Sequence, residues 1–361
     1  YTFNFGSGVT LNDTVYYYIV AQDLASPPNV GAYPSNGAGG FTSNPPAASI
    51  PPTTPTRYVI TNIPLSGNYN IGTDGNYSTL TAAITDLNLR GVSSAVNFIL
   101  TDDAYSINET FPLEIKINNV SKPTLTNTVT IKPNSGMFPF IQGAVASSAI
   151  LKILESFVRI DGSNSGGTDR SLTINNTSTD HPYGVHIGSN GSIPITGVSI
   201  INCNITNGAN YSTPNYGVII SDGEFPGIEG YFNNITIQNN RLQKSFYGIY
   251  CTAAVSPGNG NGLLITSNNL NSTGTNAIHE RGIYLEGIDG AVVSNNVVGN
   301  LGGNDAGSPT GIWYGPGTIN SSMTNNLIGP MTESTGGGTP RGIAVSSGVT
   351  NSNITVSGNE L

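Results

Sequence analysis

The sequence predicts an all-β chain whose C-terminal half winds into a solenoid of short parallel strands. The first observation is a phrase in which Gly precedes an apolar strand, and its glycine recurs every 29 to 34 residues between residues 183 and 345. Its copies begin at Tyr183, Tyr216, Tyr247, Arg281, Thr310 and Arg341. The second observation is an Asn-containing phrase between consecutive copies, as in Ile237-Gln238-Asn239-Asn240. Two interleaved phrases that share one period of about 30 residues are typical of a solenoid.

The apolar runs within each repeat favour strands over helices. They are short, β-branched and bounded by Gly, Asn and Ser, whereas a helical repeat would need apolar residues at i, i+3 and i+4. A coil of two or three strands fits about 30 residues, and stacked coils would lie about 4.8 Å apart. Asn suits the corners because it tolerates the left-handed conformation, and stacked amides can hydrogen-bond along a column.

This pattern resembles the right-handed parallel β-helix family over most of the chain from about residue 67, with regular repeats over residues 183–361. One helix is expected at its start, over residues 79–90, because Ser78 or Thr79 can cap it and Gly91 can end it. Its apolar face consists of Leu80, Ala83, Ile84 and Leu87. Because an open coil would expose apolar side chains and strand edges, we expect this helix to cover the N-terminal end of the solenoid.

The segment around this helix carries a second resemblance. A Tyr-Ser-Thr-Leu phrase at residues 77–80 is followed by a strand at 96–100, then by Tyr105 and Asn108-Glu109. This order is similar to the start of secreted pectin-esterase-like β-helices.

Residues 1–44 are expected to belong to a different fold. Residues 15–21 and 40–43 are similar to the last strands of a fibronectin type III or immunoglobulin-like sandwich, without the earlier strands. Residues 45–57 are Pro-rich and predict an extended linker, so the β-helix domain would occupy residues 58–361. Two strands alone are not a stable domain, so the first segment would pack on the solenoid or complete a sheet in a neighbouring copy. The abrupt ends suggest a piece of a longer protein.

Composition argues against several partners. Only 9% of the residues are charged, and the net charge of −9 disfavours binding to nucleic acid or to an anionic membrane. No apolar run approaches the roughly 20 residues that a membrane-spanning helix needs. Cys203 and Cys251 are expected to be small buried residues, with a disulfide between them as the alternative.

The sequence contains no recognisable catalytic phrase, so no catalytic residue, metal ligand or cofactor is assigned. Asp222 and Glu224 are the closest pair among the scattered acids, and we expect a solvated loop, with a metal or catalytic pair as the alternative. A Ca²⁺ site has no support beyond these acids. His186, at an outward position by alternation, and His279, just before a repeat strand, are expected to lie at the surface.

One outward column is a candidate binding site. If the residue after each repeated Gly points inward, the next one points outward. That column is His186, Ile219, Tyr250, Tyr284, Trp313 and Ala344. Tyr250, Tyr284 and Trp313 would then lie on successive coils of one face, where aromatic rings suit stacking on sugars. The alternative is that loops or another domain cover them.

The sandwich-like end, the Pro/Thr linker, the helical start and the Asn-rich repeats together resemble large secreted, cell-surface, adhesin-like proteins of Bacteroidetes. This resemblance implies an extracellular structural or adhesive module, or a segment of a fibre, with neighbouring domains, copies of the same chain or a surface polysaccharide as partners. Two alternatives are a carbohydrate-active enzyme and a non-catalytic carbohydrate-binding module. An acidic cleft with Arg or Lys would favour the enzyme, and an accessible aromatic column would favour the binding module.

Overall fold

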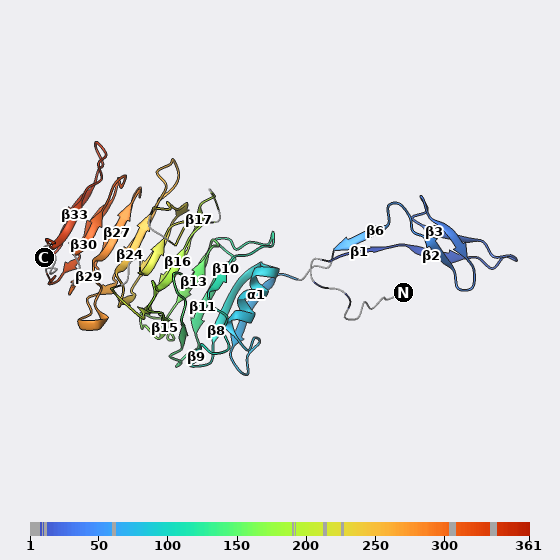
Figure 1. The fold of residues 1–361 in the computed structure, drawn as a ribbon, viewed down its shortest axis with the longest axis horizontal. Helices are drawn as coiled ribbons and strands as arrows, with labels where there is room; N and C mark the ends of the chain where they lie inside the picture. The colour runs from blue at the N-terminus through green and yellow to red at the C-terminus, as the bar shows by residue number, and fades with distance from the viewer. Residues whose placement is uncertain are drawn as a thin grey trace. The chain divides into compact units, whose positions relative to one another are not determined.

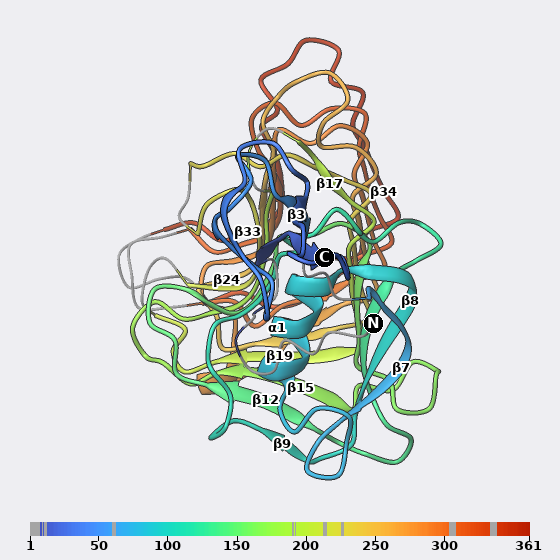
Figure 2. The ribbon, with the colours of Figure 1, turned by 90° about the vertical axis from the view of Figure 1, so that its right-hand side faces the viewer.

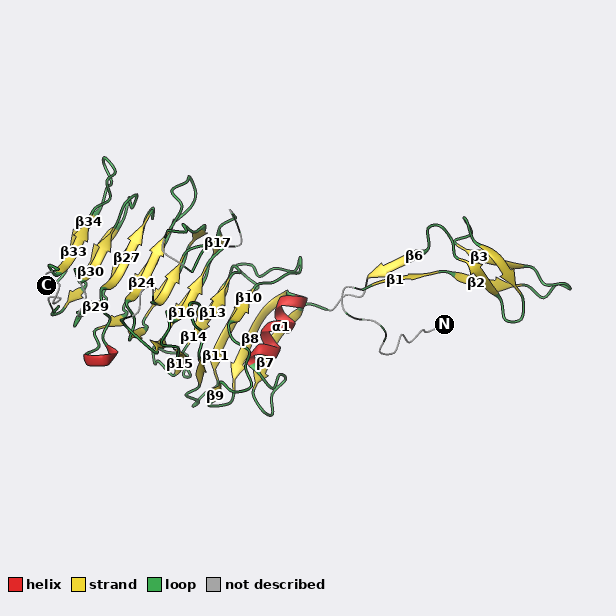
Figure 3. Cartoon of the chain, viewed as in Figure 1, coloured by secondary structure: helices red, strands yellow, loops and turns green. Residues whose placement is uncertain are grey.

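Three parallel sheets form the walls of a solenoid over residues Pro64–Leu361, one of two compact units of the chain (Figures 1 and 3). The computed structural model describes residues 8, 10, 13–59, 63–189, 191, 193–211, 215–224, 227–302, 308–332 and 338–361. Each regular coil gives one strand to each sheet, so the coil has three strands, a number that the sequence left open.

We call the first sheet the aromatic sheet. In spatial order its strands are β10 (Leu113–Ile115), β13 (Ala149–Ile153), β16 (Tyr183–Ile187), β20 (Tyr216–Ile220), β24 (Tyr247–Thr252), β27 (Arg281–Glu286), β30 (Thr310–Tyr314) and β33 (Arg341–Val345). The repeated Gly phrases therefore all lie in this sheet.

The second sheet has ten strands and follows the aromatic sheet in each regular coil. Its strands are β7 (Leu65–Ile71), β8 (Val92–Leu100), β11 (Val129–Pro133), β14 (Val158–Asp161), β18 (Ser199–Ile201), β22 (Thr236–Gln238), β25 (Leu264–Thr266), β28 (Val292–Ser294), β31 (Ser322–Thr324) and β34 (Thr355–Ser357).

The third sheet has eight shorter strands. They are β9 (Ala104–Tyr105), β12 (Phe140–Gly143), β15 (Leu172–Asn176), β19 (Cys203–Asn207), β23 (Arg241–Gln243), β26 (Asn269–Leu270), β29 (Val297–Val298) and β32 (Leu327–Ile328). A two-stranded sheet of β17 (Ile195–Thr196) and β21 (Phe232–Asn233) and a 3₁₀ turn, η1 (Gly274–Asn276), lie in connecting segments.

The repeated glycines allow adjacent coils to approach closely at one corner of the aromatic sheet. A Cβ atom on Gly248 would lie 2.6 Å from the carbonyl oxygen of Gly282 and 2.4 Å from Leu270 Cδ2. A Cβ on Gly217 would likewise lie 2.6 Å from the Gly248 carbonyl oxygen. No side chain fits at these separations, so the recurrence of Gly has a steric cause.

The predicted asparagine column is confirmed as a buried ladder between the second and third sheets. Its members are Asn240, Asn268, Asn296, Asn326 and Asn359, which are 28 to 33 residues apart. The Oδ1 atom of each later member accepts bonds from both the backbone N–H and the side-chain amide of the previous one, at 2.8–3.1 Å. The residue before each rung has a positive φ, as in Asn239 (φ 52°) and Asn295 (φ 56°), which is the conformation that Asn and Gly accept.

The helix α1 (Leu80–Arg90) covers the N-terminal end of the solenoid, as predicted (Figures 1 and 2). Thr79 Oγ1 accepts a bond from the Ala82 N–H at 3.0 Å, and Gly91 ends the helix with φ 67°. Glu109 accepts bonds from the N–H groups of Leu80 and Thr81, at 2.7 and 2.6 Å, which places a carboxylate at the positive end of the helix. The helix packs on β7 and β10 and buries its apolar face.

The interior of the solenoid is apolar. Ile160, Ile200, Ile237 and Ile265 lie opposite one another on successive strands of the ten-stranded sheet, and each is completely buried. Cys203 and Cys251 are buried free cysteines, as predicted, so the disulfide alternative is wrong. No helix among the described residues is long and apolar enough to span a membrane.

The first unit, Tyr1–Ile63, consists of two-stranded antiparallel sheets. They pair β1 (Thr14–Tyr17) with β6 (Thr56–Val59), β2 (Ile19–Gln22) with β3 (Val30–Tyr33), and β4 (Gly39–Thr42) with β5 (Ala47–Ile50). The segment 45–57, predicted as a linker, instead contributes β5 and the start of β6, because its Pro residues lie between these strands rather than within them.

Candidate carbohydrate-binding face

The outer surface of the aromatic sheet carries the predicted aromatic column. Tyr250 on β24 lies opposite Tyr284 on β27, which lies opposite Trp313 on β30. The two tyrosine rings are stacked, with centroids 5.0 Å apart and planes at 24°. Trp313 meets Tyr284 edge to face, with centroids 5.2 Å apart and planes at 82°. The prediction that these three side chains align on one face is therefore confirmed.

A second outward column, which the sequence reasoning missed, runs beside the first. It consists of the residues that precede the repeated glycines, among them Tyr183, Tyr216, Tyr247 and Arg281. Tyr216 contacts Tyr250 of the first column with ring centroids 5.2 Å apart, and stacks on Tyr247 at 5.4 Å. The two columns form one aromatic cluster that is separate from the interior core. The recurrence of Tyr before Gly was the available signal, but strict alternation does not hold at the Gly.

The rings of this cluster cover one another. Tyr250 and Tyr284 are each only 6% exposed, so their faces contact neighbouring rings rather than solvent. Trp313 is more accessible because the next coil presents the small Ala344 opposite it. Its Nε1–H donates to Oγ of Ser346, the residue directly after β33, at 2.8 Å. Trp313 is therefore the member of the predicted trio with surface available for stacking.

Charged groups flank the exposed end of the cluster. The Arg281 guanidinium carbon lies 4.6 Å from the Trp313 ring centroid and 5.0 Å from that of Tyr284, which are cation–π distances. The Tyr284 hydroxyl donates to Glu286 Oε2 at 2.7 Å. Burial, followed by this hydrogen bond, raises the pKa of Tyr284, so the hydroxyl stays protonated and Glu286 keeps an oxygen for another donor. An indole, a cation and a carboxylate are thus brought together at one place.

The opposite end of the same face is closed by Glu224, contrary to the predicted solvated loop. Its carboxylate accepts bonds from the Ala149 N–H at 2.9 Å, from the Ser148 hydroxyl at 2.8 Å and from Lys152 Nζ at 2.9 Å. Burial opposes its ionisation, but these bonds outweigh burial and hold the pKa of Glu224 below its usual value. We call Glu224 and its three partners the Glu224 clamp. It ties the segment after β20 onto β13.

His186 is buried beneath this segment, so the prediction of a surface histidine is wrong. It does face outward, as expected, but its Nε2 lies 2.8 Å from the Ser221 carbonyl oxygen, which requires a proton on that nitrogen. Its Nδ1 lies 4.0 Å from Glu224 Oε1 and has no hydrogen-bond partner. Burial lowers the pKa of His186.

His279 is also buried, because its ring stacks on Phe246 with centroids 4.9 Å apart. Asp222 does not pair with Glu224; it accepts bonds from the backbone N–H and hydroxyl of Ser189, at 2.8 and 2.7 Å. Among the described residues, no group of three or more His, Cys, Asp or Glu side chains is placed to hold a metal ion.

No protein-family model matches this chain, and no curated protein matches it. Among solved structures, the Dettilon tailspike protein is similar, with 15% identity and a TM-score of 0.30, over 80% of this chain and 68% of the tailspike chain. A pectin methylesterase from Aspergillus niger is similar with 12% identity and a TM-score of 0.30, over 81% of this chain and 89% of the esterase. The assignment of a parallel β-solenoid rests on the strand pairing described above and not on these distant likenesses.

Proposed function

We propose that this chain is an adhesive, glycan-binding module and that its aromatic sheet holds a saccharide against Trp313. The observation that carries the proposal is the unequal exposure along the aromatic column. Tyr250 and Tyr284 pack against each other, whereas Trp313 stands at the end of the column, beside Ala344. A partly exposed indole on a rigid sheet provides a flat apolar surface for the axial C–H groups of a sugar ring.

The neighbouring polar groups suit the sugar hydroxyls. Glu286 can accept hydrogen bonds, and the N–H groups of Arg281 can donate them, within the same patch as the indole. Because strands β27, β30 and β33 hold these residues, little side-chain or backbone ordering would accompany binding. We further propose that the module works outside the cell, beside other domains or copies of the same chain.

The test is retention on a panel of immobilised polysaccharides, followed by calorimetry with the retained glycan. Trp313→Ala should weaken binding at least about tenfold, which is what loss of one well-placed stacking contact implies. Phe138→Ala, at an aromatic residue that is 68% exposed outside this face, is the matched control and should bind like the natural chain.

A second variant separates stacking from folding. Ala344→Tyr would extend the column by one ring over the exposed side of Trp313, and it should block binding without a loss of thermal stability. Unchanged retention by both Trp313→Ala and Ala344→Tyr would refute the proposed site.

A polysaccharide-cleaving enzyme is the second candidate, because Glu224, Lys152 and His186 gather three titratable groups on the same face. The hydrogen bonds that both Glu224 oxygens already accept favour the clamp instead. Glu224→Gln distinguishes them. If the natural chain releases reducing ends from a polysaccharide and Glu224→Gln does not, the result supports the enzyme. If Glu224 serves only in the clamp, the variant changes stability alone.

A further inference from the structure

At one corner of the solenoid, a single coil departs from the residue types that the other coils use. Where the chain enters the ten-stranded sheet, each coil from β14 onward places a residue with positive φ two positions before the first outward residue of the strand. In order these residues are Phe157, Gly197, Asn234, Gly262, Gly290, Asn320 and Asn353. Six of the seven are Gly or Asn, which tolerate this conformation, and the exception is an aromatic residue, which tolerates it poorly.

The surroundings of Phe157 fix its unusual backbone. With φ 57°, its N–H donates to the Thr196 carbonyl at 2.8 Å, and its carbonyl accepts from the Val129 N–H at 3.1 Å. The next coil has Gly197 at the same corner, where a Cβ atom would lie 2.6 Å from the Phe157 ring. The Phe157 ring therefore packs against a residue without a side chain. Residues that their surroundings hold in such conformations cluster at functional sites, and the other six coils form this corner with Gly or Asn.

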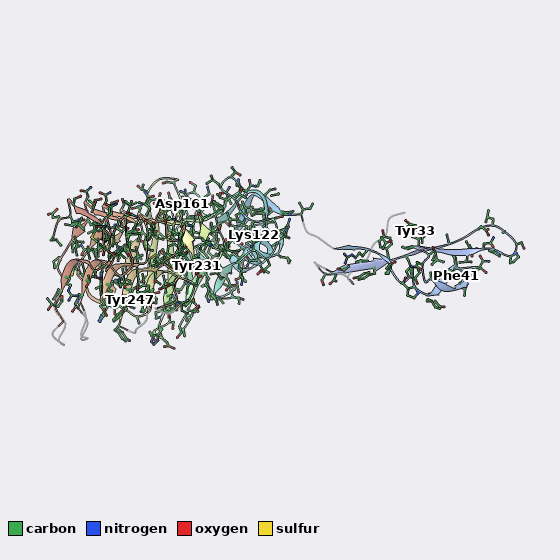
Figure 4. The ribbon with its side chains drawn as sticks, turned by 90° about the horizontal axis from the view of Figure 1, so that it is seen from above. Tyr33, Phe41, Lys122, Asp161, Tyr231 and Tyr247 are labelled. Carbon is green, nitrogen blue, oxygen red and sulfur yellow. The ribbon has the colours of Figure 1, made fainter. Side chains whose placement is uncertain are left out.

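Phe157 is the wall between two hollows. One, of about 400 Å³, lies on the outer face of β11, β14 and β18 and contains Lys132, Arg159 and Asp161. The other, of about 420 Å³, contains Lys116, Lys122 and Glu155. Phe157 lines both hollows, which we together call the Phe157 groove; Lys122 and Asp161, one from each hollow, are labelled in Figure 4.

The Phe157 groove is positively charged in an acidic chain. It contains four of the chain's 12 Lys and Arg residues, although the net charge is −9. Its two carboxylates are already paired, Asp161 with Arg159 at 2.7 Å and Glu155 with Lys122 at 2.5 Å. Two cations, Lys116 and Lys132, remain without an ion pair among the residues that the structure describes. Two unpaired ammonium groups on either side of an aromatic ring favour a ligand with anionic groups.

The remaining lining favours an anion that also carries hydroxyl groups. Thr128, Thr130 and Ser199 place hydroxyl groups on the floor of the first hollow, where they can bond to other hydroxyls. A peptide could not add itself as a strand here, because β11 and β14 are each paired on both sides. We propose that the Phe157 groove binds an acidic oligosaccharide, with its carboxylates at Lys116 and Lys132 and the apolar face of one sugar ring on Phe157.

This site is independent of the one at Trp313. Figure 4 shows Tyr247 of the aromatic face and Asp161 of the groove on opposite sides of the solenoid. Trp313 variants should therefore leave binding in the groove intact, and groove variants should leave binding at Trp313 intact.

The probes are trimers of glucuronic, galacturonic and mannuronic acid, with neutral cellotriose as the uncharged reference and a short oligoglutamate as the acidic peptide. Binding to the 361-residue chain is measured by calorimetry at low and high salt. At least one uronate trimer should bind, weaken as salt rises, and bind at least about tenfold more tightly than cellotriose. Failure of all three uronates, or equal binding of cellotriose, overturns the proposal, as does preferential binding of oligoglutamate.

Three variants locate the binding. Phe157→Asn gives this corner a residue type that the other coils use, so the variant should fold with an equal or higher melting temperature. It should lose at least about tenfold in uronate affinity. Lys132→Gln should cause a similar loss, and Arg241→Gln, which removes an exposed cation on the third sheet, should cause none. Uronate affinity that survives both Phe157→Asn and Lys132→Gln would place the ligand elsewhere and overturn the proposal.

Discussion

Asn296→Ala should destabilise the solenoid by about 4 kcal/mol, because the buried side chain makes four hydrogen bonds that Ala cannot replace. Its Oδ1 accepts from the N–H and the side-chain amide of Asn268, both at 3.0 Å. Its Nδ2 donates to the Ile265 carbonyl and to Asn326 Oδ1, both at 2.9 Å. With about 1 kcal/mol for each bond, the sum is a large fraction of the stability of an ordinary domain.

The measurement is urea unfolding followed by circular dichroism, with the fluorescence of Trp313 as a second probe. The control is Asn175→Ala, which removes an outward-facing Asn whose side-chain amide donates one bond, to Gln142 Oε1 at 2.8 Å. It should cost about 1 kcal/mol. If the two variants unfold at the same urea concentration with the same slope, the ladder contributes no more than a surface pair and the reasoning is refuted.

Four further outcomes are expected, each measured by unfolding. Glu224→Gln should lower the free energy of unfolding by about 1–3 kcal/mol by weakening a half-buried ion pair; no change would show that the clamp is dispensable. Burial lowers the pKa of His186, so the unfolded chain binds the proton first and stability should fall as pH drops from about 7 to about 5. His186→Ile introduces the residue type that the next coil has at this position, and it should remove the contribution of His186 to the pH dependence of stability. An unaltered pH dependence would contradict this. Gly248→Ala should cost about 1–3 kcal/mol by overpacking, whereas a neutral effect would mean that the coils can separate at that corner. Phe157→Asn should gain about 1 kcal/mol, and a loss would show that the ring stabilises the corner.

The sequence predicts the repeating features of this fold well because each one has a physical cause that recurs in successive coils. Gly recurs at a position where the next coil's carbonyl leaves no room for a Cβ, and Asn recurs at a position where only its amide can bond both to the next coil and to a carbonyl. The helix was predictable for a different reason, since Thr79, Gly91 and the apolar spacing between them are short-range signals. The Gly and Asn contacts join neighbouring coils, and they are visible in the sequence because the same contact recurs in successive coils at a fixed period.

The candidate sites depend on contacts that no local pattern encodes. The alignment of Tyr250, Tyr284 and Trp313 follows from alternation, but their burial depends on neighbouring columns and on Arg281. The Glu224 clamp joins residues 72 to 76 positions apart, through a segment whose sequence has no repeat. Phe157 is visible as an exception only after the register of seven coils has identified its corner.

The register of the coils does not depend on the length of the segments that connect their strands. Leu264 lies opposite Val292, although residues 253–263 connect β24 to β25 and only residues 287–291 connect β27 to β28. A connection can therefore lengthen by several residues while the strands on either side keep their partners. Insertion of a foreign peptide within the exposed residues 255–258 should consequently leave the three sheets unchanged. The solenoid would then serve as a scaffold on which new surface segments can be displayed at fixed intervals.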